Sequence, residues 1–210
     1  MLHPVIIPQV VGVWREHRPV PLRPPPSIRT LVEAGLQDVL SALSEVSHQL
    51  SEAGIRHVVV GGLAIGVYGW PRATREVDLL LGMEGFGRLP SGELEPRVAL
   101  PEIVEGIPIN YMYVDVAGKF LALALDAPLF SNGIPFAPPE VLVCTKLLRL
   151  AMRDQADIVQ ILKAKLVDRK RIRAFLGARQ PLLLGPFDAL VSQADAESER
   201  ESRVSCAYGF

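Results

Sequence analysis

Residues 58–81 of the chain read VVVGGLAIGVYGWPRATREVDLLL. The β-branched segment at 56–61 is typical of a buried strand, and the glycine pair that ends it leads into a short predicted helix at 63–68. A second apolar strand is expected at 76–81. This succession of strand, glycine turn, helix and acidic strand predicts a small layer of sheet and helix with a site at its edge.

Two carboxylates are expected to converge on the second of these strands. Because side chains alternate along a strand, Glu76 and Asp78 share one face, whereas Val77 and Leu79 point into the packing of the sheet. Such a pair suits Mg²⁺, which proteins bind through one or two carboxylates together with substrate phosphates. In two-metal sites the ions bridge the attacking and leaving oxygens of a phosphoryl or nucleotidyl transfer.

Gly61 and Gly62 carry no side chain that would block a close approach, and their amides begin a helix where a triphosphate could bind. Taken alone, a glycine pair is usually only a turn, and an acidic pair on a strand is usually a solvated edge. A P-loop is excluded, because Val67 and Tyr68 stand where Lys and Ser or Thr are required. The four histidines show no paired spacing, so a zinc site is not expected.

The rest of the chain divides by composition. Residues 1–29 hold seven of the 18 prolines and predict a polyproline-like arm. The core is expected at 30–137, and it contains an amphipathic helix from Leu36 to Leu50 and a further strand at 107–114. Residues 197–210 are expected to form a polar tail that frays. Between core and tail, residues 138–196 predict helices at 140–152, 154–165, 168–176 and 187–194.

The overall composition restricts location and partners. Among 210 residues there are 22 Lys and Arg and 23 Asp and Glu, a net charge of -1, so any nucleic-acid contact has to be a local patch. Cys144 and Cys206 are far apart and form no disulfide framework, which favours the cytoplasm. No stretch is apolar for the ~20 residues that a membrane-spanning helix needs, so no membrane contact is expected.

The spacing of these motifs resembles a known family. Val60-Gly61-Gly62, a spacer of 13 residues and Glu76-Val77-Asp78-Leu79 resemble the signature of the DNA polymerase beta-like nucleotidyltransferases. Residues 58–81 look like the core of the minimal AbiEii/AbiGii-type abortive-infection toxins. Further along the chain, a second block of residues resembles a second conserved block of that family. It consists of Pro139, Glu140, Lys146, Leu147, Arg149, Arg153, Asp154, Asp157 and Ile158.

The resemblance implies an α+β, sandwich-like fold, in which a small mixed nucleotidyltransferase sheet with flanking helices precedes a helical C-terminal part. It also implies that Glu76 and Asp78 are catalytic and hold one or two Mg²⁺ ions. The nucleotide-binding residues would be Gly61, Gly62, Arg72, Arg75, Lys146, Arg149, Arg153 and Asp154. Helical spacing places Lys146, Arg149, Arg153 and Asp157 on one polar stripe, and the alternative is a solvated face with an Arg153–Asp157 ion pair.

Two positions depart from the family pattern. Glu76 stands where the family more often has Asp, which shifts a bound ion by about a methylene group. The family also supplies a third carboxylate from the next central strand, and the best-matching position here is Asn110, which cannot act as a general base. Asp115 is a substitute catalytic candidate, provided that a bulge or a strand end turns it to the same face.

The resemblance implies a Mg²⁺-dependent transfer of a nucleoside monophosphate from an NTP to an RNA 3′ end, such as that of tRNA, or to a protein hydroxyl. The chain would then be one component of a toxin-antitoxin pair, with a cognate antitoxin or toxin as its partner. The alternative is a catalytically degenerate nucleotidyltransferase fold that binds nucleotide or acts as an antitoxin or regulator. Asn110 favours this alternative.

Overall fold

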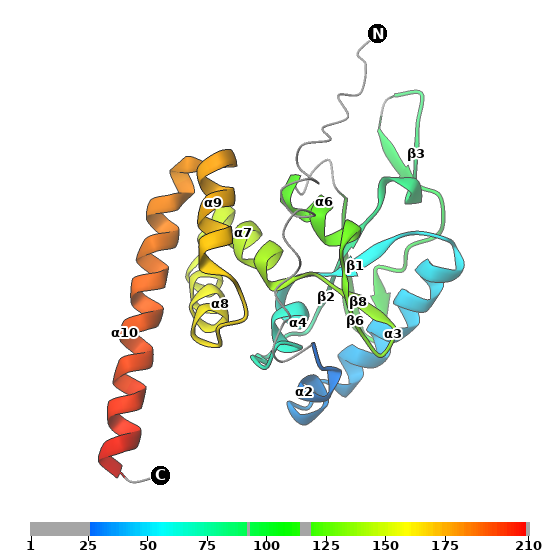
Figure 1. Ribbon diagram of the computed structural model, residues 1–210. Helices are drawn as coiled ribbons and strands as arrows, with labels where there is room; N and C mark the ends of the chain where they lie inside the picture. The colour runs from blue at the N-terminus through cyan, green and yellow to red at the C-terminus, as the bar shows by residue number, and fades with distance from the viewer. Residues whose placement is uncertain (1–25, 92, 114–118, 209–210) are drawn as a thin grey trace.

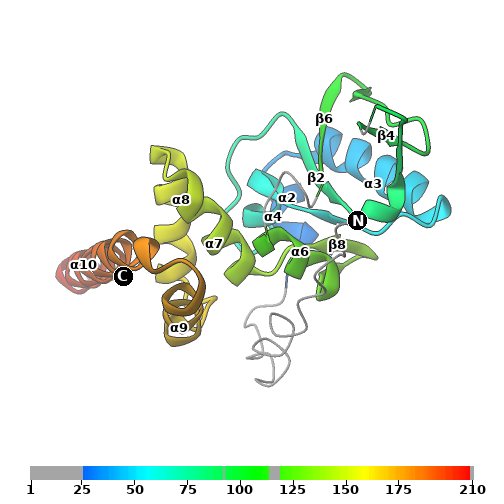
Figure 2. The ribbon, with the colours of Figure 1, turned by 90° about the horizontal axis from the view of Figure 1, so that it is seen from above.

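The computed structural model describes residues 26–91, 93–113 and 119–208 (Figures 1 and 2). A mixed β-sheet with helices packed against it forms the first part, and a group of helices forms the second. Figure 2 shows the helical group to one side of the sheet. The predicted α+β class, with a small mixed sheet followed by a helical part, is confirmed.

The main sheet has six strands in the order β5-β6-β2-β1-β8-β7. β2 pairs in parallel with β6 and β1 in parallel with β8, and the other pairs are antiparallel. The strands are β1 (His57–Val59), β2 (Val77–Leu81), β5 (Ile103–Val104), β6 (Ile107–Tyr113), β7 (Leu129–Ser131) and β8 (Ile134–Phe136). The two sequence-predicted strands of the glycine unit are therefore central neighbours, β1 and β2.

Among the described residues, four helices belong to the sheet unit: α2 (Ile28–Glu33), α3 (Gln37–Glu52), α4 (Gly61–Gly66) and α6 (Lys119–Asp126). The apolar stripe of α3 is buried, as its spacing predicts, and Gly54 follows the helix with a φ of 70°. α3 and α6 both pack on β1 and β2, and every residue of β1 is buried. Both faces of the central strands are therefore covered.

The helical part consists of α7 (Pro139–Arg149), α8 (Met152–Lys163), α9 (Arg169–Arg179), a 3₁₀ turn (Pro181–Leu183) and α10 (Leu184–Tyr208). α7 contacts α4 and α6 on the sheet side and α8 and α9 on the other, so it joins the two parts (Figure 1). None of the described helices is long and apolar enough to cross a membrane.

The last helix is longer than the sequence predicts. The expected end near Ala194 and the frayed tail from 197 are wrong, because α10 continues to Tyr208. Lys163 of α8 contacts both Glu197 and Glu201 of α10, and Ala194 is buried beside them. Packing and ion pairs against α8 thus stabilise the helical conformation of this segment, although its polar composition suggested fraying.

Two segments contain structure that the sequence analysis did not predict. Residues 82–101, expected to be irregular, contain a 3₁₀ turn (Met83–Gly85) and a hairpin of β3 (Phe86–Arg88) and β4 (Leu94–Pro96). Residues 119–136, for which no element was predicted, contain α6, β7 and β8. The expected arm at 1–29 lies mostly outside the described residues, and its last part begins α2.

Candidate functional site

Three polar side chains meet where β2 and β6 run side by side. Asp78 and Asn110 are directly paired across these strands, and Glu76 lies just before β2. The amide nitrogen Nδ2 of Asn110 donates to Oε2 of Glu76 at 3.2 Å and to Oδ1 of Asp78 at 3.0 Å. The two carboxylates therefore converge, as strand alternation predicts, and we call Glu76, Asp78 and Asn110 the strand cluster.

The strand cluster opens to solvent on one side only. Val77 and Leu79, which alternate with its members, are fully buried in the core. Asp78 is half-buried, whereas Glu76 and Asn110 are exposed. A ligand can thus reach the carboxylates from the open side while the apolar face of β2 fixes their position.

Burial raises the pKa of Asp78, and the nearby Glu76 carboxylate raises it further. The hydrogen bond from Asn110 and the positive charges of Arg149 and Arg72 oppose this shift without cancelling it. A carboxylate that is costly to ionise gains more than a solvated one from a cation bound beside it. Asp78 therefore has both the position and the environment of a metal ligand.

Gly61 allows Asp78 to lie against the glycine turn. Its φ is 66°, in the left-handed region, and a Cβ at this position would lie 2.0 Å from Oδ2 of Asp78. The amide of Val60 also donates to the carbonyl oxygen of Asp78 at 2.9 Å. Only glycine permits both the turn and this contact. α4 has just six residues, so the turn contributes close approach more than a helix dipole.

Gly62 lies in the same way against Arg72. A Cβ on Gly62 would lie 3.1 Å from Cζ and Nη2 of Arg72 and 3.3 Å from Nη1. The guanidinium group thus packs directly on the backbone of the glycine turn. Since Gly61 contacts Asp78, the two glycines place a carboxylate and a guanidinium on adjacent backbone.

A set of ion pairs with a buried centre connects this arginine to α7 and α8. Its members are Arg72, Lys146, Arg149, Asp154 and Asp157, which we call the charge network. Lys146 Nζ donates to Oδ1 of Asp154 at 3.0 Å and to Oδ2 of Asp157 at 2.7 Å. Nε of Arg72 lies 3.2 Å from Oδ1 of Asp157, and Nε of Arg149 lies 3.2 Å from Oδ2 of Asp154.

The single polar stripe predicted for these residues is wrong, because they lie on two helices. α7 ends at Arg149, Leu150 has a left-handed φ of 48°, and α8 begins at Met152. The alternative Arg153–Asp157 ion pair is not formed either, since Asp157 faces Lys146 and Arg72 instead. The break turns α8 back on α7 and lets its aspartates meet Lys146.

Arg75 and Arg153, both predicted to bind nucleotide, are exposed. In the part of the chain that the structure describes, neither forms an ion pair with the strand cluster or the charge network. Asp115, the candidate substitute carboxylate, lies outside the described residues. Asn110 fills the third position of the strand cluster by its hydrogen bonds to Glu76 and Asp78, and the roles of Arg75, Arg153 and Asp115 stay predictions.

The connection between Arg72 and Asp157 was missed by the sequence analysis. No sequence pattern links two residues so far apart in the chain, and the helix break at Leu150 hides the relation of Lys146 to Asp154. The polar character of these positions was visible, but their pairing depends on how α7 and α8 fold together. Tertiary packing alone supplies that information.

The donor set of the strand cluster fits a hard divalent cation. No group of three or more His, Cys, Asp or Glu side chains among the described residues is arranged to hold a metal, so the candidates are the two carboxylates. The Asn110 amide reaches both of them, and rotating it by 180° would present its oxygen to the same point. Two carboxylates, one amide oxygen and substrate phosphates are ligands that Mg²⁺ prefers.

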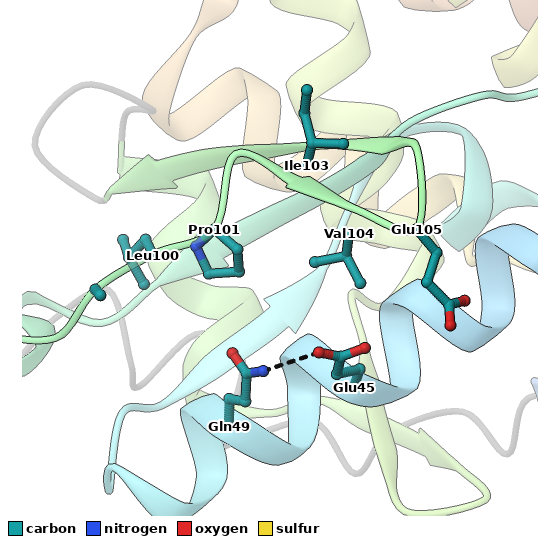
Figure 3. Close-up of a pocket in the computed structure, with 8 residues that line it drawn as sticks. Glu45, Gln49, Leu100, Pro101, Ile103, Val104 and Glu105 are labelled. Atoms are coloured by element: carbon teal, nitrogen blue, oxygen red, sulfur yellow. Dashed lines mark hydrogen bonds between the residues drawn. The ribbon is translucent and has the colours of Figure 1, made fainter.

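A cavity of about 500 Å³ lies elsewhere, between α3 and β5 (Figure 3). Glu45 and Gln49 of α3 form one side of it, joined by a 3.1 Å hydrogen bond, and Pro101, Ile103 and Val104 form another. No residue of the strand cluster or the charge network lines this cavity. It is therefore not the binding space of the carboxylates.

Comparisons with known proteins add little to this geometry. No known protein family and no curated protein matches the sequence. Among solved structures, the fold is similar to an antigenic nucleotidyltransferase-like protein from Paracoccidioides brasiliensis, with a TM-score of 0.40 and 14% sequence identity. The match covers 80% of this chain and 89% of that chain. A likeness this distant carries no functional argument, so the function is argued below from the side chains.

Proposed function

We propose that the protein is a Mg²⁺-dependent nucleotidyltransferase that moves a nucleoside monophosphate from an NTP to an acceptor hydroxyl. The observation that carries this proposal is the meeting of Glu76, Asp78 and Asn110 beside the turn at Gly61. Carboxylates fixed on a central strand and open to solvent on one side suit a cation that arrives with substrate phosphates. The guanidinium of Arg72 on Gly62 brings a phosphate-binding group to the same turn.

In the proposed reaction the acceptor oxygen forms a bond to the α-phosphorus, and the bond from that phosphorus to its bridging oxygen breaks. Pyrophosphate leaves with the electron pair of the broken bond. Mg²⁺ would neutralise the charge that develops on the phosphate oxygens. Glu76 and Asp78 would hold it, and Arg72 and Arg149 would neutralise the remaining phosphate charge.

The acceptor proton restricts the mechanism. Asn110 cannot take it, because an amide is not a base in this pH range. Among the described residues, the proton would pass to Glu76, to Asp78 or to water, and Asp115, which lies outside them, stays a candidate base.

The proposed acceptors are an RNA 3′ end, such as that of tRNA, or a protein hydroxyl, and a toxin-antitoxin role in the cytoplasm remains part of the proposal. The net charge of -1 gives no general attraction to nucleic acid. An RNA acceptor would need a local patch, and Arg75, Arg149 and Arg153 are exposed arginines that could contribute to it.

A second candidate function is nucleotide binding without transfer, in a regulatory or antitoxin protein. The amide at position 110 favours it, because Asn110 bridges the two carboxylates in the place of a third acid. Both candidates need the same site for a metal-bound triphosphate. They differ only in whether the bound nucleotide is turned over.

The test is transfer of label from each of four α-labelled NTPs, with Mg²⁺, to total tRNA and to cell-extract protein. We expect label on one acceptor with the wild type and at least a hundredfold less with Asp78→Asn, which keeps the shape of the side chain but removes its charge. Asp195→Asn, the same change in an exposed α9–α10 ion pair, is the control. No transfer by a folded wild type that still binds NTP would favour the second candidate.

A further inference from the structure

The charge network has a regular construction around Lys146. Each of its two aspartates gives one carboxylate oxygen to Lys146 and turns the other toward the Nε of an arginine. Asp157 connects Lys146 to Arg72, and Asp154 connects it to Arg149. One buried ammonium group therefore fixes two carboxylates, and each carboxylate faces one arginine.

The exposed fractions of the side chains separate the centre of the network from its ends. They are 9% for Lys146, 5% for Asp154 and 7% for Asp157, against 27% for Arg72 and 77% for Arg149. The ammonium group of Lys146 is already bound to two carboxylates in the interior. A phosphate would have to displace one of these buried partners to reach it, whereas the arginines are open to solvent.

Both arginines keep donors available for a ligand. The contacts with the aspartates involve Nε, and no described residue accepts a hydrogen bond from Nη1 or Nη2 of Arg72. The guanidinium of Arg72 lies on Gly62, next to Gly61, which contacts Asp78 of the strand cluster. Arg149 is joined to Arg72 through Asp154, Lys146 and Asp157. Guanidinium groups held at Nε can still bind phosphate through their outer nitrogens.

We propose that Lys146, Asp154 and Asp157 are positioning residues that hold Arg72 and Arg149 toward the strand cluster, and that the two arginines, not Lys146, bind the phosphates. This inference rests on the proposed function, which supplies the phosphate ligand. It changes the role expected for Lys146 and Asp154, which act through their partners. It also gives Asp157 a function, as the residue that orients Arg72.

The contacts themselves leave room for adjustment. Nε of Arg72 and Oδ2 of Asp154 are buried without a well-formed hydrogen bond, although each lies 3.2 Å from its opposite charge. Unsatisfied buried polar atoms are unfavourable. A small rotation of either guanidinium would align these pairs.

The experiment is a double-mutant cycle read by calorimetric binding of ATP and of inorganic tripolyphosphate, each with Mg²⁺. Arg72→Ala and Asp157→Asn should each weaken binding about tenfold, as expected for the loss of a charge-assisted contact. In the Arg72→Ala background, Asp157→Asn should have less than about a twofold further effect, because it acts through Arg72. Equal effects of Asp157→Asn in both backgrounds would overturn the proposal.

The same cycle is run on the second arm with Arg149→Ala and Asp154→Asn. Asp195→Asn serves as the control, because it breaks an Arg169–Asp195 ion pair in α9 and α10, away from the network. Its binding constants should equal those of the wild type. Lys146→Arg keeps a positive charge between the aspartates, and we expect this variant to bind ATP within about threefold of the wild type. If Lys146 were itself a phosphate ligand at a fixed position, the same substitution would weaken binding by more than that.

A readout without ligand separates this proposal from the proposed function. The Nε–H signals of Arg72 and Arg149 in ¹H–¹⁵N spectra should shift and exchange faster with water in Asp157→Asn and Asp154→Asn respectively, and both should change in Lys146→Met. Unchanged signals in folded variants would overturn the positioning role. If the wild type bound neither ATP nor tripolyphosphate, the proposed function would fail, while these spectra would still decide whether the network positions the arginines.

Discussion

Two glycines fix the site at the level of single residues. A Cβ on Gly61 would collide with the Asp78 carboxylate, and a Cβ on Gly62 would lie tightly against the Arg72 guanidinium. This explains why a strand, a glycine pair and an acidic strand occur together: the turn and the acid are in contact. The glycine pair and the carboxylates were visible in the sequence, but which side chain lies against each glycine could be seen only in the folded structure.

Gly61→Ala should destabilise the protein and remove ligand binding. A left-handed alanine costs about 1–2 kcal/mol, and the new Cβ would also displace the Asp78 carboxylate. Gly54→Ala is the matched control, because Gly54 has a φ of 70° with nothing within 4 Å of a Cβ. Urea unfolding should show the backbone cost in both variants, whereas calorimetry should show loss of Mg²⁺-ATP binding in Gly61→Ala alone. Normal binding by Gly61→Ala would refute the contact.

Asn110→Asp tests the metal fit of the strand cluster. It places a third carboxylate directly opposite Asp78 and beside Glu76, where like charges repel. Thermal unfolding in EDTA should therefore occur below the wild-type temperature, and added Mg²⁺ should raise it more than in the wild type. If Mg²⁺ stabilised the two proteins equally, the cluster would not be a cation site.

His57 gives the fold a pH dependence. Its Nδ1–H donates to the carbonyl of Ile55 at 3.1 Å, and in the neutral ring Nε2 accepts from the hydroxyl of Ser47 at 2.7 Å. Burial lowers the pKa of His57 below its ordinary value of 6.5. The unfolded chain then binds the proton more readily, so the free energy of unfolding should be largest above pH 6.5 and fall as the pH is lowered.

Chemical denaturation between pH 5 and 8 checks this prediction. His57→Gln should lower stability at pH 8 by about 1–3 kcal/mol through the lost buried hydrogen bonds, and should flatten the pH dependence. His48→Gln, at an exposed position on α3 beside Glu52, is the control and should change stability by about 0.5 kcal/mol or less. A wild-type profile that rises toward acid pH would contradict the neutral, buried imidazole.

At the level of elements, the strands and helices with clear periodicity were predictable. The apolar spacing of α3, the β-branched run of β1 and the acidic strand β2 are local patterns, and each matches the structure closely. β7 and β8 have three residues each, too few for a period to emerge. Their turn did carry a signal that was overlooked, Asn132-Gly133, a pair favoured in two-residue hairpins.

Two hairpins of the sheet use the same kind of turn with different residues. Asn132 and Gly133 have φ values of 49° and 80°, and Glu105 and Gly106 have 49° and 81°. Asn tolerates the left-handed region better than Glu does. Glu105→Asn should therefore raise the melting temperature, by an amount equivalent to about 0.5 kcal/mol. Asn132→Glu should lower the melting temperature by a similar amount. If the two substitutions did not shift the melting temperature in opposite directions, the two turns would not be equivalent.

The charge network shows why helix periodicity alone gave the wrong arrangement. Spacing placed Lys146 and Asp157 on one continuous face, but the left-handed Leu150 ends α7 and reverses the chain. The same residues consequently face one another across two helices. The sequence indicated which residues were polar, and the packing of α7 on α8 determined that they are buried partners.

For the whole molecule, the sheet and the helical part contribute different components of one candidate site. β2 and β6 carry the strand cluster, while α7 and α8 carry Lys146, Arg149, Asp154 and Asp157. Arg72, in the loop between α4 and β2, contacts both parts. The α+β class was predictable from the order of elements, but this shared site depends on how the two parts pack.

The measurement that tests the central claim most directly is calorimetric titration of ATP into the full chain, with and without Mg²⁺, for the wild type and for Asp78→Asn. It is independent of the acceptor and of turnover. The account predicts binding by the wild type that requires Mg²⁺, and a loss of at least tenfold in Asp78→Asn, because the half-buried carboxylate is proposed to hold the ion. Binding that is equal with and without Mg²⁺, or unchanged in folded Asp78→Asn, would contradict it.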